Sequence, residues 1–276
     1  MAGWISPKIN KILYIGRELV MDRIRNRPQS ILFSNTPWEE EIRRTFRQTR
    51  HRIGFAKLDG NNGGAFDLVV PLNIPESKRL SDNPGLYPRN RLPLPDSRLI
   101  ALYDDKPAFF DHLRAEGLTR YIPSGDRDKL PLMLKVKVGG DGKGCHLILS
   151  EEDQDRHANK LDSPDYFIQQ MIPGRREYAT HMLMSNGRLQ AALGVEYEFD
   201  KPYPIKGQDK PVAVRLQRDP FLDDWVRLLA RHRYEGLCCV NYKILEGQPL
   251  LLELNPRFGG SLALFFFSFL RHLPPA

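Results

Sequence analysis

An apolar strand near the end of the chain carries two oxygen-bearing side chains two residues apart, Glu253 and Asn255. Side chains alternate between the two faces of a strand. This spacing therefore predicts that both lie on one face, while Leu252 and Leu254 point into the core. A carboxylate and a carboxamide oxygen on one face are ligands that a hard cation such as Mg²⁺ takes. These residues predict a metal site on the strand.

The residues directly after this strand suit anions. Arg257 follows Asn255 by two residues, and a Gly-Gly-Ser turn at 259–261 comes next. A guanidinium and the bare backbone amides of such a turn both hold phosphate or carboxylate oxygens. An ordinary edge strand is the alternative interpretation, and the run Pro-Arg-Phe-Gly-Gly-Ser argues against it. A metal site, an anion clamp and a glycine turn in one segment indicate phosphoryl chemistry.

A second candidate for phosphate binding is the glycine-rich loop 139–144. Its backbone amides have little side-chain cover and could close over phosphates. It is not a Walker A loop, because Cys145 follows it and because it joins two strands rather than a strand and a helix. Lys135 and Lys137 precede the loop on one side of the strand, and either could contact a phosphate. A plain flexible hairpin tip is the alternative interpretation.

The first hundred residues have the pattern of a small α/β unit. Three strands are expected in it, at 31–35, 53–58 and 66–72. Thr36 and Pro37 are expected to begin a helix, because a threonine N-cap, a proline at the first helical position and three following glutamates are typical of a helix start. Residues 74–95 are rich in Pro, Asn, Arg and Ser, which predicts an irregular connection.

After an amphipathic helix at 105–116 the pattern changes to strands joined by tight turns. Strands are expected at 130–138, from the glycine loop to 149, and at 166–171, 177–184, 188–197, 237–245 and from 249 onward. Helical patterns are expected at 150–161 and 221–229. The apolar run 262–270 is too short to cross a membrane, which needs roughly 20 residues, and it predicts a buried helix.

The order of these parts resembles that of the ATP-grasp superfamily, carboxylate–amine ligase type, over residues 103–261. The closing motif is similar to that of carbamoyl-phosphate synthetase large subunits and amino-acid ligases, at Glu253, Asn255, Pro256, Arg257, Gly259 and Gly260. The resemblance implies an α+β/α/β chain with an ATP-grasp fold. Its expected parts are an N-terminal α/β domain (1–102), a small lobe with the glycine-rich hairpin (103–170) and a C-terminal lobe with the metal site (171–276). ATP would lie between the two lobes.

The resemblance also implies roles in ATP binding. Lys106 would touch the α-phosphate, and the backbone of Gln170 and Ile172 would bond the adenine edge. Glu177 would meet the ribose hydroxyls or a nearby lysine, unless it is only a structural ion-pair partner. The implied ATP-binding residues are Lys106, Lys135, Lys137, Gly140, Gly142, Gly144, Gln169, Gln170, Met171, Ile172 and Glu177.

The implied metal ligands are Glu253, Asn255 and Asn241, the last on the preceding strand. An amide adds no negative charge there, and Asn241 could be only a strand residue. Arg257 and Lys135 are expected to be catalytic. The residues expected to hold substrate or phosphate are Arg257, Gly259, Gly260 and Ser261. The implied cofactors are ATP and Mg²⁺, with Mn²⁺ as an alternative ion.

The implied activity is that of an ATP-dependent ligase. It would activate a carboxylate as an acyl phosphate and join it to an amine as an amide or peptide bond, releasing ADP and phosphate. Two alternatives stay open: a kinase-like ATP-grasp phosphotransferase, and a nucleotide-binding module without catalysis. Lys206 and Arg215 could each reach substrate or phosphate, or be solvated.

The bulk properties favour small-molecule partners. The net charge is +7 and the pI about 9.3, but the basic residues are spread out, so nucleic acid is not expected. The three cysteines have neither disulfide nor metal spacing, and no signal peptide is visible, which predicts a cytoplasmic protein without a membrane partner. Carboxylate and amine substrates are expected. A homodimer is a further expectation, in which a partner protomer would supply part of the acceptor site.

Overall fold

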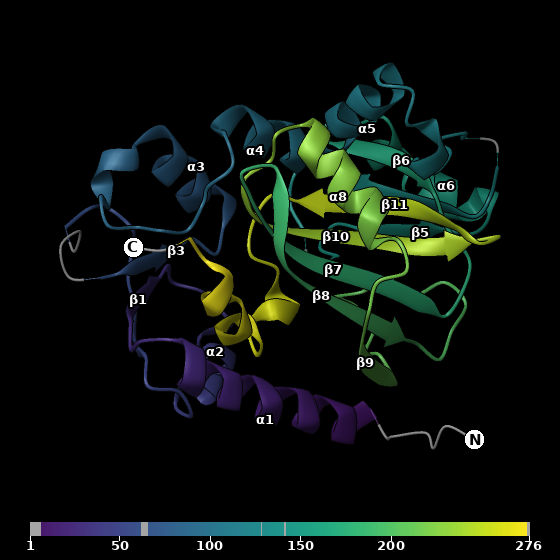
Figure 1. Cartoon of the computed structure of the whole chain (residues 1–276). Coiled ribbons are helices and arrows are strands. Elements are labelled where there is room, and N and C mark those ends of the chain that lie inside the picture. Colours follow the sequence, from purple (N-terminus) through teal and green to yellow (C-terminus); the bar gives the residue numbers. More distant parts are fainter. Residues whose placement is uncertain (1–6, 62–65, 128, 141, 275–276) are drawn as a thin grey trace.

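The computed structural model describes residues 7–61, 66–127, 129–140 and 142–274. In this part of the chain the strands form three sheets, with helices packed around them (Figure 1). The mixed α+β/α/β class predicted from the sequence is confirmed. Among the helices of the described ranges, none combines the length and the apolar character needed to cross a bilayer.

The first sheet is small and parallel, with the order β2-β1-β3. Its strands are β1 (Ser30–Phe33), β2 (Arg52–Phe55) and β3 (Leu68–Val70), and each overlaps a predicted range. The central strand β1 is buried along its whole length, as expected for a parallel strand covered on both faces.

The helices of this first unit differ from the sequence prediction. α2 (Glu39–Phe46) begins two residues later than Pro37, with Trp38 at its N-cap position. The prediction that residues 74–95 are irregular was wrong, because they contain α3 (Ile74–Asp82) and the short turn η1 (Pro84–Leu86). The side chain of Asn73 caps α3 by accepting a hydrogen bond from the Glu76 amide. The long helix α1 (Pro7–Arg25) was not predicted.

The second sheet is antiparallel, with the order β5-β4-β6. Its strands and the helices near it are β4 (Leu132–Val136), β5 (His146–Ile148), β6 (Tyr166–Gln170), α4 (Ser97–Asp104), α5 (Lys106–Ala115), η2 (Thr119–Tyr121), α6 (Glu151–Arg156) and α7 (Ala158–Leu161). The predicted α5 is confirmed, and Asp105 caps it through the Ala108 amide. The predicted helix 150–161 is divided in two at His157.

The third sheet has five strands in the order β11-β10-β7-β8-β9, all antiparallel. They are β7 (Arg176–Ser185), β8 (Arg188–Glu198), β9 (Ala213–Gln217), β10 (Gly236–Leu245) and β11 (Gln248–Asn255). All except β9 were predicted. α8 (Leu222–Arg231) packs Trp225 and Leu229 against this sheet, in one core with Tyr242.

A β-bulge in the β10–β11 hairpin decides which side chains face the neighbouring sheet. Asn241 pairs with Glu253 and Tyr242 pairs with Leu251, so Leu252 is the extra residue. The prediction that Leu252 points into the core was wrong, because Leu251 fills that position and Leu252 lines a cavity.

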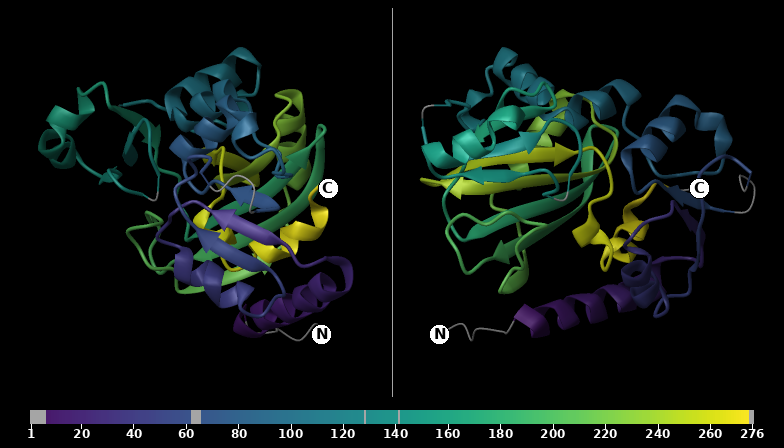
Figure 2. Two further views of the ribbon diagram at one scale, coloured as in Figure 1. Left: turned by 90° about the vertical axis from the view of Figure 1, so that its left-hand side faces the viewer. Right: turned by 180° about the vertical axis from the view of Figure 1, so that it is seen from behind.

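The C-terminal segment connects the first and third sheets. It consists of η3 (Gly260–Leu262) and η4 (Phe266–His272), so the apolar run 262–270 is buried as predicted but forms 3₁₀ turns rather than an α-helix. Phe266 packs in one core with Phe33 of β1 and Leu193 of β8. Figure 2 shows this yellow segment between the two units.

Candidate active site

A cavity of ≈ 330 Å³ is lined by residues of β4 and β6 from the small antiparallel sheet and of β10 and β11 from the large one. Its volume is typical of a small-molecule site. Most of the predicted site residues line it: Lys106, Lys135, Gly140, Gly142, Gln169, Gln170, Met171, Ile172, Glu177, Asn241, Glu253, Asn255, Arg257, Gly259, Gly260 and Ser261.

Two predicted residues, Lys137 and Gly144, are not among the residues that line this cavity. β4 ends at Val136, so the strand alternation that would have aligned Lys137 with Lys135 is lost. Both backbone groups of Lys137 are bonded, to Asp165 and Lys106. Gly144 lies against the Val136 side chain, where a Cβ on the glycine would come within 2.7 Å of Val136 Cγ1. Asp141, also part of the predicted loop, lies outside the described residues.

Glu253 is the central anion of the cavity. Its Oε1 accepts hydrogen bonds from the amide groups of Asn241 (2.8 Å) and Asn255 (2.9 Å). Burial opposes its ionisation, but the charges of Lys106 and Lys135, with the Asn255 hydrogen bond and the Lys206 charge, together outweigh burial and lower the pKa of the carboxyl to about 2. The shared face of Glu253 and Asn255, predicted from their spacing, is confirmed by this contact.

Two buried lysines stand beside this carboxylate. Lys106 Nζ donates to the Gly139 carbonyl at 2.5 Å and lies 3.7 Å from Glu253 Oε2. Lys135 Nζ donates to Leu252 O (2.9 Å) and Gln169 Oε1 (3.2 Å). Burial lowers the pKa of Lys135, and the nearby Glu253 charge works against that shift. Both ammonium groups are therefore held at fixed points on the cavity wall.

Asn241 does not offer its oxygen to the cavity. Its Oδ1 accepts a hydrogen bond from Lys206 Nζ at 2.8 Å, and the same ammonium is 2.9 Å from Glu177 Oε1. Burial works against the charge on Lys206, but Glu177, together with Tyr197 and Cys239, outweighs it and raises the lysine pKa. Lys206, for which the sequence left two interpretations open, therefore lines the cavity. Arg215 instead pairs with Glu196 and Glu198 and does not line the cavity.

The glycine turn after β11 is packed too tightly for any side chain at its two glycines. A Cβ on Gly259 would lie 2.5 Å from His181 Cε1, and one on Gly260 would lie 2.7 Å from the Trp38 indole. The Arg257 guanidinium lies 5.9 Å from the Trp38 ring centre. Trp38, at the N-cap position of α2, comes from the N-terminal unit, so this unit also contributes to the cavity wall.

His181 lies directly beneath the glycine turn. It is fully buried. Its Nε2 is 2.6 Å from Ser261 Oγ, and its Nδ1 has no hydrogen-bond partner in the described part of the chain. Burial, with Lys206 and Arg257 nearby, lowers the imidazole pKa to about 3. His181 is therefore a neutral support for Ser261.

The linker after β6 has the features of an adenine site only in part. The Gln170 amide already donates to Ser124 O at 2.6 Å, so only its carbonyl could meet a ligand. The Ile172 amide has no backbone partner among the described residues. The Ile172 carbonyl accepts from Lys243 Nζ at 2.7 Å, and burial lowers the pKa of this lysine to about 8.

The glycine loop lies against the loop that carries Lys206. Gly142 has a φ of +69° and touches the Lys206 backbone, so a Cβ would collide with that carbonyl. Gln208 Nε2 donates to the carbonyls of Gly142 (2.8 Å) and Cys145 (2.9 Å). These contacts hold the loop closed over the cavity.

Solved structures with a similar fold exist at low sequence identity. An L-amino acid ligase from Bacillus licheniformis aligns with a TM-score of 0.60 and 13% identity over 88% of this chain and 71% of that chain. An N5-carboxyaminoimidazole synthetase from Staphylococcus aureus, complexed with ADP, aligns with a TM-score of 0.56 and 16% identity over 86% of this chain and 73% of that chain. A D-alanine–D-alanine ligase from Bacillus anthracis aligns with a TM-score of 0.55 and 14% identity over 85% of this chain and 88% of that chain. The chain has the ATP-grasp fold.

A comparison with curated protein sequences finds one relative of this chain. Acetyl-CoA carboxylase from Dictyostelium discoideum is 30% identical over 142 residues, 46% of this chain. The chain spans only 6% of that protein's length. No family model matches the sequence.

Several residues that line the cavity were missed at the sequence level: Trp38, Cys145, Tyr197, Cys239 and Lys243. Lys243 alternates with Asn241 on β10, and that spacing could have identified it. Trp38 carries no such signal, because more than two hundred residues separate it from the glycine turn that it touches.

Proposed function

We propose that this protein is an ATP-dependent carboxylate–amine ligase that forms an acyl phosphate and releases ADP and phosphate. One observation carries the proposal: the ionised Glu253 lies among Lys106, Lys135 and two amides, in a cavity that also holds Arg257 and a glycine turn. Such a set fits a triphosphate and a carboxylate side by side. The ATP-grasp fold of named ligases and synthetases supports it.

The nucleotide would lie between the small and large antiparallel sheets. Met133, Met171 and Ile172 give apolar surface for adenine, and the Ile172 amide is a donor for its edge. Lys106, Lys135 and the amides of the glycine loop would hold the phosphates. Gln169 would act indirectly, because its oxygen fixes Lys135. In this proposal Lys137 and Gly144 have no direct contact with ATP.

Magnesium fits two of the three predicted ligands. Glu253 Oε2 faces the cavity with Lys106 3.7 Å away, and Asn255 Oδ1 has no hydrogen-bond partner among the described residues. These hard oxygens suit Mg²⁺. Asn241 does not fit, because Lys206 already occupies its oxygen. A bound Mg²⁺ would neutralise phosphate charge, and the Lys206 ammonium would add a second positive charge near it.

Arg257 and the glycine turn would bind the substrate carboxylate. A carboxylate oxygen attacks the γ-phosphorus, the bond from that phosphorus to the bridging oxygen breaks, and ADP leaves. An amine then attacks the acyl carbon, loses a proton and displaces phosphate. Phosphoryl transfer depends mainly on positioning and charge neutralisation. The fixed positions of Lys135, Arg257 and Ser261 supply both.

The proposal also includes the expected substrates, domain division, cellular location and oligomeric state. The substrates would be a small carboxylate and an amine. The proposed three-part division near residues 102 and 170 is supported by the presence of three separate sheets. A cytoplasmic location is supported by three cysteines without a disulfide. A homodimer stays part of the proposal, to be tested by light scattering.

The test is to incubate the full chain with ATP, Mg²⁺ and pools of amino acids, and to measure ADP, phosphate, AMP and pyrophosphate. We expect ADP and phosphate in equal amounts, with a new amide seen by mass spectrometry and lost in Glu253→Gln. ADP with a stable phosphorylated product would favour a phosphotransferase. Nucleotide binding without turnover would favour a non-catalytic module, and AMP with pyrophosphate would overturn the mechanism.

A further inference from the structure

The outer face of α1 is apolar. Ten large apolar side chains are exposed in the described chain, and half of them lie on this one helix, which marks it as a distinct surface. They are Ile9 (52% exposed), Ile12 (68%), Leu13 (56%), Val20 (56%) and Ile24 (72%). We call these five residues the α1 apolar stripe.

The stripe is continuous along the helix. Positions separated by three or four residues share one helix face, and Ile9, Leu13, Val20 and Ile24 follow that spacing. Gly16 occupies the position between Leu13 and Val20 on this face, and a Cβ there would meet nothing within 4 Å. A helix of this length extends about 28 Å. Figures 1 and 2 show α1 at the edge of the molecule.

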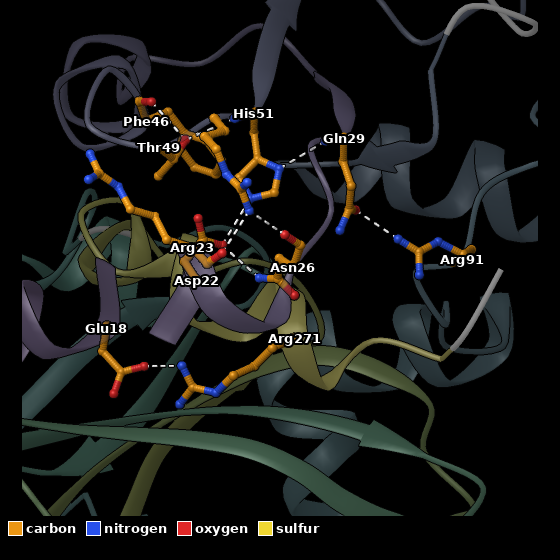
Figure 3. Close-up of polar contacts among 11 residues, drawn as sticks. Glu18, Asp22, Arg23, Asn26, Gln29, Phe46, Thr49, His51, Arg91 and Arg271 are labelled. Carbon is orange, nitrogen blue, oxygen red and sulfur yellow. Dashed lines mark hydrogen bonds and ion pairs between the residues drawn. The ribbon is translucent and has the colours of Figure 1, made fainter. Parts of the chain in front are cut away.

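The rotation of α1 is fixed by buried ion pairs on its inner face. Glu18 and Asp22, the two acids of the helix, are 1% and 2% exposed. Glu18 pairs with Arg271, and Asp22 bonds His51 at 2.9 Å (Figure 3). Turning the stripe inward would break these contacts and leave buried charges unpaired. The outward stripe is therefore part of the folded arrangement.

Basic side chains accompany the stripe. Lys8 and Arg17 are exposed beside it, with Arg17 also paired to the buried Glu18, and Arg23 is exposed within it, three residues after Val20. Both acids of α1 are buried, so a second copy packed on this face would bring like charges together, which argues against self-association. An apolar stripe with basic neighbours and no exposed acid on the helix has the character of a helix that lies in a membrane interface.

We propose that α1 binds the surface of an anionic lipid membrane, with the stripe in the acyl boundary and the cations at the headgroups. Such a helix lies in the plane of the bilayer and crosses nothing, which is compatible with the lack of a spanning helix among the described residues. This surface function is independent of the proposed ligase activity.

The experiment is sedimentation of the full chain with vesicles of phosphatidylcholine alone and of phosphatidylcholine mixed with phosphatidylserine. We expect binding to the mixed vesicles that weakens as salt is raised. The pair Lys8→Gln and Arg23→Gln should lower the partition coefficient about 25-fold, on the basis of about 1 kcal/mol per cation. The pair Ile12→Ser and Val20→Ser should lower it at least about 10-fold.

The matched control is Val212→Ser with Leu149→Ser, which removes two similarly exposed apolar side chains elsewhere and should bind as the parent does. Circular dichroism and melting curves establish that each variant is folded. Absence of binding to mixed vesicles, or equal loss in the control, would overturn the proposal. A dimer in light scattering that Ile12→Ser and Val20→Ser abolish, without lipid binding, would assign the stripe to self-association instead.

Discussion

Lys206 directs its ammonium at the carboxamide oxygen of Asn241, 2.8 Å away, and thereby occupies the oxygen that a metal ion would have used. Glu177 holds the same ammonium at 2.9 Å, and the other end of Asn241 donates to Glu253. One chain of contacts thus joins two carboxylates through a lysine and an amide. A positive side chain stands where a second metal contact was predicted.

An acid in place of this amide should strengthen metal binding. We expect Asn241→Asp to lower the Mg²⁺ concentration needed for half-maximal ADP binding, because the added charge offers a third hard oxygen near Glu253. Calorimetric Mg²⁺ titration with ADP present measures it. Asn186→Asp, which adds the same charge in the β7–β8 turn, should leave it unchanged. Weaker Mg²⁺ binding in Asn241→Asp would mean that Lys206 simply pairs with the new acid.

Loss of the Arg257 guanidinium should affect turnover far more than nucleotide binding. We expect Arg257→Ala to lower the rate of ADP formation about 10²- to 10³-fold, the typical effect of removing one preorganised donor. ADP affinity, measured by calorimetry, should change little, because in the proposed site Lys106 and Lys135 hold the phosphates. Arg257→Lys should recover part of the rate. Unchanged turnover in Arg257→Ala would remove this residue from the proposed mechanism.

A side chain at Gly142 should open the glycine loop. A Cβ there would collide with the Lys206 carbonyl, at a φ of +69°. We expect Gly142→Ala to raise the KM for ATP and to lower turnover. Gly187 is the matched control, with the same φ of +69° but nothing within 4 Å, so Gly187→Ala should cost about 1 kcal/mol of stability and leave the KM unchanged. Equal KM values in both variants would contradict the closed loop.

His181 should make the fold sensitive to mild acid. Its pKa falls from an ordinary 6.5 to about 3, mainly through burial, so the unfolded chain takes up the proton first. Stability should therefore fall as the pH drops below 6.5, by about 1.4 kcal/mol per pH unit. Glu253, with a pKa lowered from 4.5 to about 2, loses its contribution only below pH 4.5.

Urea unfolding of the parent and of His181→Gln between about pH 5 and 6.5 separates the contribution of His181. Glu253 stays ionised there, and His146 and His272, whose pKa values are also lowered, are present in both proteins. His181→Gln binds no proton, so its stability should fall less steeply with acid than that of the parent. Above about pH 7.5 the plots of unfolding free energy against pH should run parallel for the parent and for His181→Gln, because neither the folded nor the unfolded imidazole is protonated there. Parallel curves throughout the acid range would show that His181 does not cause the sensitivity.

The closing strand shows how much of the site the sequence could predict. A side-chain period of two puts Glu253 and Asn255 on one face wherever the strand lies, and their shared hydrogen bond follows from that spacing. Residue order also predicted most strands, because alternating apolar residues and glycine turns are local signals. α1 was missed because its acids are buried and its apolar stripe is exposed, the reverse of the usual pattern.

The sequence by itself determined which chemical groups are present and which neighbours share a strand face. The tertiary structure alone decided that Leu252 is the bulged residue, that Lys206 occupies the oxygen of Asn241, and that Trp38 covers the glycine turn. These relationships join residues far apart in the chain. They depend on how the sheets pack against each other, and no local periodicity encodes that packing.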